Sequence, residues 1–207
     1  MVRNHMYSFI AKTFASLLLF VSFAVVPGAL AGDPADPHAA AYEAMVKLAT
    51  PGKHHEILSQ SVGTWKTHMK SYMDPSAPPV EYDGKVVVES VLDGRFVRQT
   101  YHAMMMGNKF TGIGLAGYDN AKNEYVSTWI DNFGTSITQG KGTYDATKKT
   151  LTTKGMMFDP SMGKDVPYKS VQTFIGKNTM SLNMYMVVDG KQVLLFEMTY
   201  TRLKDQS

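Results

Sequence analysis

From Gly63 onward, hydrophobic and polar residues alternate along the chain with a period of two, and turn signals interrupt the alternation at fairly even intervals. Such alternation is typical of β-strands with one buried face. Asp93-Gly94 and Asp189-Gly190 are dipeptides that favour two-residue hairpins, and Gly107-Asn108 is a third candidate. The segments between turns predict about ten strands, near residues 62–73, 80–92, 95–106, 109–118, 124–131, 135–144, 149–158, 167–176, 179–188 and 191–203.

These segments also predict the fold class. No helical pattern separates them, so consecutive strands joined by short turns form an antiparallel meander. A meander of this length protects its edge strands best by closing on itself. We therefore expect an all-β fold, an antiparallel up-and-down β-barrel of about ten strands with a short N-terminal helix.

The helical pattern is confined to the segment before residue 60. Ala41, Met45 and Leu48 recur on one face until Pro51-Gly52 stops the run, and a further turn is expected at residues 55–58. A helix with so narrow an apolar stripe is not stable alone. We expect it to pack at one end of the barrel.

The first thirty-one residues have the pattern of a cleaved signal peptide. A basic lead precedes the apolar run Phe14–Val26, and Ala29-Leu30-Ala31 has the small residues of a signal-peptidase site. The run is shorter than the roughly 20 residues that span a bilayer, so no membrane span is expected after cleavage. The sequence thus predicts a periplasmic or secreted bacterial protein divided into a signal peptide (1–31), a linker and helix (32–60) and a barrel domain (61–205).

Charge and composition exclude several classes of function. Removing the leader removes two basic residues, which leaves (21 − 2) − 18 = +1, too small a net charge to predict a nucleic-acid partner. The chain has no cysteine, which excludes disulfides, thiolate catalysis and cysteine-ligated clusters. No recognisable catalytic motif is present, and no cofactor is predicted.

Residues 111–120, TGIGLAGYDN, contain the Gly112-x-Gly114-x-x-Gly117 spacing of a dinucleotide-binding fingerprint. That fingerprint needs a helix after the glycines to receive phosphate, whereas here a turn and the strand EYVSTWID follow. The dinucleotide interpretation therefore fails. Gly112 and Gly114 are two apart and share one face of a strand, where missing side chains allow a sharp bend or the close approach of another group.

Several motifs recur along the predicted barrel. They are Gly63-Thr64-Trp65, Gly94-Arg95-Phe96, the G-x-G-x-x-GYDN of residues 112–120 followed by YVSTWID at 125–131, the GTYD of residues 142–145, and Thr199-Tyr200-Thr201-Arg202. Together these motifs resemble the bacterial domain-of-unknown-function 1579 family over residues 51 to 203. The resemblance implies a calycin-like barrel, but it assigns no reaction and no catalytic residue.

A barrel of ten strands is wide enough to hold a small ligand. The first hypothesis is that the interior binds a small, largely apolar molecule, because methionine and aromatic side chains make an adaptable apolar lining. The expected lining is Trp65, Met69, Trp129, Met184 and Met186, with Gln99, Asp131, Glu197 or Arg202 as polar anchors. The same residues would equally well fill a closed core.

Other classes of function stay open. His102, Met104 and Met106 are spaced by two, so a strand would project them from one face as ligands that suit copper(I). Asp131 and Glu197 could do acid–base chemistry if both point inward. The outer surface could instead bind another protein, which an exposed apolar patch would favour. The sequence does not predict the oligomeric state.

Overall fold

The structure is a computed structural model, and it describes residues 37–74 and 76–204. The predicted signal peptide at residues 1–31 lies outside the described residues. The chain divides into two units, Met1–Ala41 and Tyr42–Ser207, and helix α1 (Pro37–Ala49) crosses their boundary. The second unit contains the barrel and helix α2.

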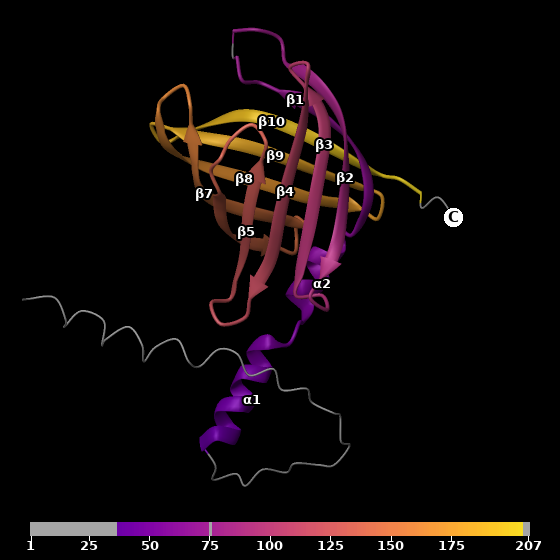
Figure 1. The fold of residues 1–207 in the computed structure, drawn as a ribbon, viewed down its shortest axis with the longest axis vertical. Coiled ribbons are helices and arrows are strands. Elements are labelled where there is room, and N and C mark those ends of the chain that lie inside the picture. The colour runs from indigo at the N-terminus through magenta and orange to yellow at the C-terminus, as the bar shows by residue number, and fades with distance from the viewer. Residues whose placement is uncertain (1–36, 75, 205–207) are drawn as a thin grey trace, which may run out of the picture. The chain divides into compact units, whose positions relative to one another are not determined.

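The ten predicted strands are confirmed, and they close into a single antiparallel barrel in which β1 pairs with β10. Every other pairing joins strands that are consecutive in the sequence, so the topology is up-and-down. Figure 1 shows β8, β9 and β10 crossing the direction of β3, β4 and β5 on the opposite wall, as strands tilted around a barrel do. The strands are β1 (Gly63–Ser71), β2 (Val80–Val91), β3 (Phe96–Met105), β4 (Asn108–Asp119), β5 (Glu124–Asp131), β6 (Thr138–Asp145), β7 (Thr150–Asp159), β8 (Lys164–Gly176), β9 (Thr179–Val188) and β10 (Lys191–Arg202).

Two of the tight turns have a left-handed backbone at both central positions. Asp189 and Gly190 have φ angles of 50° and 75°, as the predicted hairpin dipeptide requires. Between β3 and β4, Met106 and Gly107 have φ angles of 52° and 75°. This turn therefore begins one residue earlier than the Gly107-Asn108 prediction, and it ends β3 at Met105.

Helix α2 (Lys53–Ser59) packs against β3 and β4 and buries Leu58. The helix begins at Gly52, whose N–H donates to Nδ1 of His55 at 3.0 Å. His54 stacks on Tyr118 with ring centroids 4.1 Å apart, and burial lowers the pKa of this histidine. The histidine pair thus has a structural role at the start of α2.

The prediction that the face of Met45 and Leu48 docks on the barrel is wrong for both residues. Met45 is 58% exposed and Leu48 is 50% exposed. The buried helical residues are instead His55 and Leu58 of the shorter helix α2, which comes directly before β1 and contacts β3 and β4.

The inner face of the barrel follows from the strand register. Trp65, Val86, Tyr101 and Gly112 are partners across β1 to β4, and they occupy one row of the interior. Trp65 is fully buried and Val86 nearly so, which confirms that the Trp65 face of the first strand is interior. Trp65, Val86 and Tyr101 are therefore all buried in this row of the interior.

The two glycines of the TGIGLAG segment face inward, and large side chains lie against both. A Cβ atom at Gly112 would collide with the indole ring of Trp129, and a Cβ at Gly114 would collide with Gln99. The expectation of close approach by another group is therefore confirmed. The missing side chains let Trp129 and Gln99 lie against the wall of β4.

We expect Gly112→Ala to destabilise the protein by about 1–3 kcal/mol, because the added methyl overpacks Trp129. Gly176→Ala is the matched control, since no atom lies within 4 Å of a Cβ at that strand position. Denaturant unfolding followed by tryptophan fluorescence gives both free energies. Equal stability of the two variants would contradict the account of Gly112.

Candidate functional site

Trp129, Gln99 and Asp131 lie together on the inner wall, as the ligand hypothesis requires. Gln99 and Trp129 are both register partners of Gly114, and Asp131 is the partner of Gly112. The indole Nε1 of Trp129 donates to Oδ2 of Asp131 at 2.9 Å. All three side chains are half-buried although they face the interior.

Met184 and Met186 also face inward, from β9. Their register partners are inner residues of β8, Ser170 for Met184 and the buried Tyr168 for Met186. Both methionines are half-buried, whereas Met180 nearer the start of the same strand is 2% exposed. The interior is therefore less tightly packed toward the end of β9.

Trp65, Met69 and Arg202 belong to the packed part of the barrel. Trp65 donates from Nε1 to the carbonyl oxygen of Ser61 at 2.8 Å, and Met69 is 4% exposed. The Arg202 guanidinium lies 4.0 Å from the Trp65 ring centroid and donates to the carbonyl oxygen of Val62. Trp65 and Arg202 therefore stabilise the end of the barrel where β1 begins, and Arg202 uses its donors on backbone carbonyls there. Met69 packs farther along β1, opposite Met198.

Glu197 does not line the interior, so the expectation that it anchors a ligand there is wrong. It is the register partner of Lys70 and Asn183, on the outer face, while Met198 beside it faces inward. Its Oε1 accepts a hydrogen bond from the Tyr72 hydroxyl at 2.9 Å. Glu197 and Asp131 thus lie on opposite sides of the barrel wall and cannot form an acid–base pair.

The proposed copper ligands do not share one face of a strand. His102 and Met104 project outward from β3, but Met106 lies in the left-handed turn beyond that strand. The alternation that predicted a common face ends at Met105. Within the described part of the chain, no group of three or more His, Cys, Asp or Glu residues is arranged to hold a metal ion.

Aromatic rings lie against the inner wall where strands carry glycine. Besides Trp129 at Gly112, the Tyr168 ring and hydroxyl occupy the space where Gly140 and Gly155 lack a side chain. Tyr101 lies in the same way against Gly84. The alternation along each strand indicates that these glycines face inward. It does not indicate which aromatic ring lies against each glycine, because those rings belong to other strands.

Two buried hydroxyls in this interior have no hydrogen-bond partner, Oγ1 of Thr67 and the phenol of Tyr101. Thr67 is 1% exposed and Tyr101 is 4% exposed. Burial raises the pKa of Tyr101, and an interaction with the Thr67 hydroxyl, whose geometry falls outside the limits of a hydrogen bond, offsets part of that rise. Both groups therefore face the interior as neutral hydroxyls. Sequence reasoning did not identify either of them.

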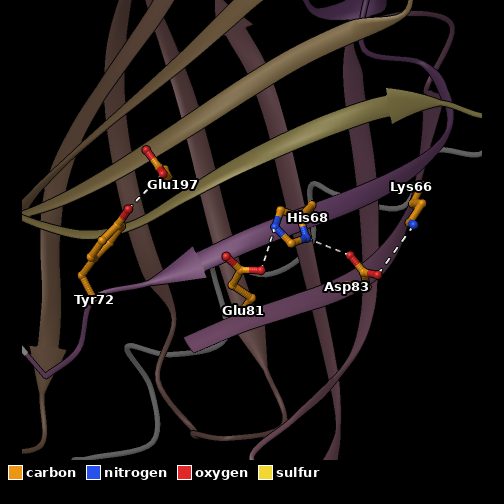
Figure 2. Close-up of polar contacts among 6 residues, drawn as sticks. All are labelled: Lys66, His68, Tyr72, Glu81, Asp83 and Glu197. Atoms are coloured by element: carbon orange, nitrogen blue, oxygen red, sulfur yellow. Dashed lines mark hydrogen bonds and ion pairs between the residues drawn. The ribbon is translucent and has the colours of Figure 1, made fainter. Parts of the chain in front are cut away.

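A polar groove of about 440 Å³ lies on the outer face of β1, β2, β9 and β10. Figure 2 shows His68 between two carboxylates, with Nδ1 3.0 Å from Asp83 and Nε2 3.4 Å from Glu81. The hydrogen bond from His68 and the charge of Lys66 lower the pKa of Asp83. All these side chains are exposed, so water screens their charges strongly.

A second outer groove, of about 390 Å³, crosses β3 to β7 and is mainly apolar. Phe96, Leu115 and Val126 are among its lining residues, and Leu115 is 40% exposed. Ile113 and Ile130, which are register partners on the same outer face, are exposed as well. This is the kind of exposed apolar patch that a protein-interaction role requires.

The closed ten-stranded barrel places the chain among lipocalin-like barrels. Within that class, residues 50–202 match the family described as "Protein of unknown function (DUF1579)", and the chain belongs to this family. No curated protein matches the sequence. Among the described residues, no helix is long and apolar enough to cross a membrane.

Two solved structures are similar in fold. Rv2717c from M. tuberculosis matches with a TM-score of 0.56 and 16% identity, over 75% of this chain and 100% of that one. The S-type phycobiliprotein lyase CPES from Guillardia theta matches with a TM-score of 0.54 and 14% identity, over 74% and 94% of the two chains. At these identities the likeness shows the shared barrel alone.

Alkaline pH should destabilise the barrel through its inward tyrosines. Burial raises the pKa of Tyr101, Tyr168 and Tyr200, and raises that of Tyr125 to about 12. Above pH 10 the unfolded chain ionises tyrosine while the folded barrel resists it, so the free energy of unfolding falls as the pH rises from about 10. Below pH 10 this contribution to stability is complete.

The ionisation of tyrosine can be followed by absorbance at 295 nm after a jump to about pH 11.5. This pH is about 1.5 units above the ordinary tyrosine pKa. We expect one fraction of tyrosine to ionise at once and the remainder to ionise with unfolding. Tyr125→Phe reduces the slow fraction, and Tyr42→Phe, at an exposed position, leaves it unchanged. Immediate ionisation of all tyrosines would contradict the burial argument.

Proposed function

We propose that the barrel binds a small, largely apolar molecule in its interior. The observation that carries this proposal is the position of the rings of Trp129, Tyr101 and Tyr168 against inner-face glycines. A ring that lies along the wall extends less far toward the barrel axis than one that projects from it. This arrangement favours an interior that side chains do not fill completely.

The partial exposure of inward side chains supports the same proposal. Trp129, Met184 and Met186 are half-buried, although the barrel wall covers their outer side. Flexible, polarizable methionine side chains adapt to ligands of different shape. Gln99 and Asp131 add polar groups to the apolar lining, as small-molecule sites commonly do.

Similarity to known structures supports the barrel fold on which this proposal depends, and it does not identify a ligand. One similar barrel is named a phycobiliprotein lyase. A protein-interaction role through the outer apolar groove stays the alternative, and so does a filled core. We prefer interior binding because it also accounts for the inner glycines and for the two hydroxyls without partners.

Ser170→Phe tests whether the interior is open, because Ser170 faces inward between Thr153 and Met184. We expect wild-type protein to bind the neutral fluorophore N-phenyl-1-naphthylamine saturably at one site. The added ring occupies the same space, so Ser170→Phe should weaken binding about tenfold or more with little loss of stability. Titration by fluorescence gives the Kd, and thermal unfolding gives the stability.

Ser181→Phe, on the outer face of β9, is the matched control and should bind the fluorophore as wild type does. If the core is filled, Ser170→Phe instead destabilises the barrel by about 1–3 kcal/mol through overpacking. That result, or the absence of saturable binding to wild type, would contradict interior binding.

We also propose that the protein is exported, on the basis of the leader at residues 1–31 alone. Expression of the full chain in a bacterium should give a periplasmic product of 207 − 31 = 176 residues that begins at Gly32. Ala31→Arg removes the small residue that the peptidase requires and should block processing. Ala35→Arg, beyond the site, serves as control. An uncleaved wild-type chain in the cytoplasm would refute export.

A further inference from the structure

The unpartnered hydroxyls of Thr67 and Tyr101 lie beside one another in the barrel wall. Thr67 is on β1, Tyr101 is on β3, and Gly84 of β2 is the register partner of Thr67. A Cβ atom at Gly84 would lie 2.8 Å from Oγ1 of Thr67 and 2.5 Å from Cε2 of Tyr101. The glycine therefore lets both hydroxyl-bearing side chains pack against the same patch of wall.

A buried hydroxyl without a partner costs free energy, since it has lost its hydrogen bonds to water. Each of these hydroxyls can donate one hydrogen bond. Because burial raises the pKa of Tyr101, its phenol keeps its proton across the physiological range. Two donors near one another can converge on one acceptor atom of a bound molecule.

The surrounding charges favour a neutral acceptor over an anion. Of the described cations with inward register, Lys164 and Lys191 lie at exposed strand ends. Arg202 lies opposite Trp65, and its Nε, Nη1 and Nη2 donate to backbone carbonyls. Asp131, also on the inner face, would repel a carboxylate. A charged ligand group at Tyr101 would thus be buried without a counter-ion, which is strongly unfavourable.

Aromatic rings connect Tyr101 to the exposed rim of the barrel. The ring of Phe110 lies 5.7 Å from that of Tyr101, and the ring of Phe133 lies 4.9 Å from that of Phe110, measured between centroids. Phe133 is 45% exposed, just after β5. Apolar rings therefore extend from the hydroxyl pair to the exposed segment that follows β5.

We propose that the hydroxyls of Tyr101 and Thr67 donate hydrogen bonds to a neutral carbonyl oxygen of an apolar ligand. This inference rests on the proposed function, since it assigns the ligand class of the same interior. It specifies an aromatic or aliphatic ketone, quinone, ester or amide in place of a free carboxylic acid or a plain hydrocarbon.

Three probes of nearly equal shape test the ligand class by displacing N-phenyl-1-naphthylamine. They are 2-acetylnaphthalene, its alkene analogue 2-isopropenylnaphthalene, and 2-naphthoate. We expect wild type to bind the ketone about tenfold more tightly than the alkene, because one carbonyl oxygen gains hydrogen bonds from both hydroxyls. The naphthoate should bind more weakly than the ketone.

Tyr101→Phe combined with Thr67→Val removes both donors while it keeps the shape of the side chains. In this variant the ketone-to-alkene ratio should fall close to one, and the stability of the empty protein should be unchanged or higher. The control variant Tyr185→Phe with Thr199→Val, on outer strand positions, should keep the wild-type ratio.

Infrared difference spectra of carbonyl-labelled 2-acetylnaphthalene bound to wild type provide a measurement that needs no variant. We expect the carbonyl stretch to shift to lower frequency than in hydrocarbon solvent. An unshifted stretch, equal binding of ketone and alkene, or tightest binding of the naphthoate would overturn this inference and leave interior binding intact. Failure of wild type to bind the fluorophore itself would overturn both.

Discussion

Closure of the barrel depends on the seam where the first strand meets the last. Trp65 of β1 and Arg202 of β10 are opposite each other in the register, and the guanidinium lies over the indole ring. A cation held against tryptophan away from water is attracted to the face of the ring. The same guanidinium donates to the carbonyls of Val62 and Lys177, which joins the segment before β1 and the turn before β9 to the seam. Without this pairing, β1 and β10 would be exposed edge strands.

The seam also explains how much of the fold the sequence predicted. Gly63-Thr64-Trp65 and Thr199–Arg202, motifs from opposite ends of the barrel sequence, meet there. Gly63 has a φ of 133°, and the Arg202 guanidinium occupies the space of its missing side chain. Alternation and turn dipeptides were sufficient for strand number, order and closure, because a meander has few other ways to pair. They did not predict α2 as the packed helix, since its buried face is only one turn long.

The site residues were harder to predict, because their roles depend on neighbours on other strands. Glu197 and Arg202 are five residues apart, so a regular strand places them on opposite faces, and the bulge near Leu194 precedes both. If Arg202 faces inward, the period of two is therefore sufficient to exclude Glu197 from the inner face. The apolar run before Glu197 obscured this alternation in the sequence. Thr67 followed the inward alternation correctly. Whether its hydroxyl has a partner depends on Tyr101, two strands away, and no sequence pattern carries that information.

The hydroxyl pair and the glycine beside it are hard to explain by stability alone. Valine at position 67 and phenylalanine at position 101 would fill the same space without burying an unpartnered donor, and such replacements are commonly neutral or stabilising. Gly84, in the middle of a strand, also weakens that strand relative to a residue with a side chain. Three local features that lower stability therefore coincide at one patch of the inner wall. Natural proteins tend to depart from optimal packing where function requires it, and this coincidence is a second, independent reason to propose binding inside the barrel.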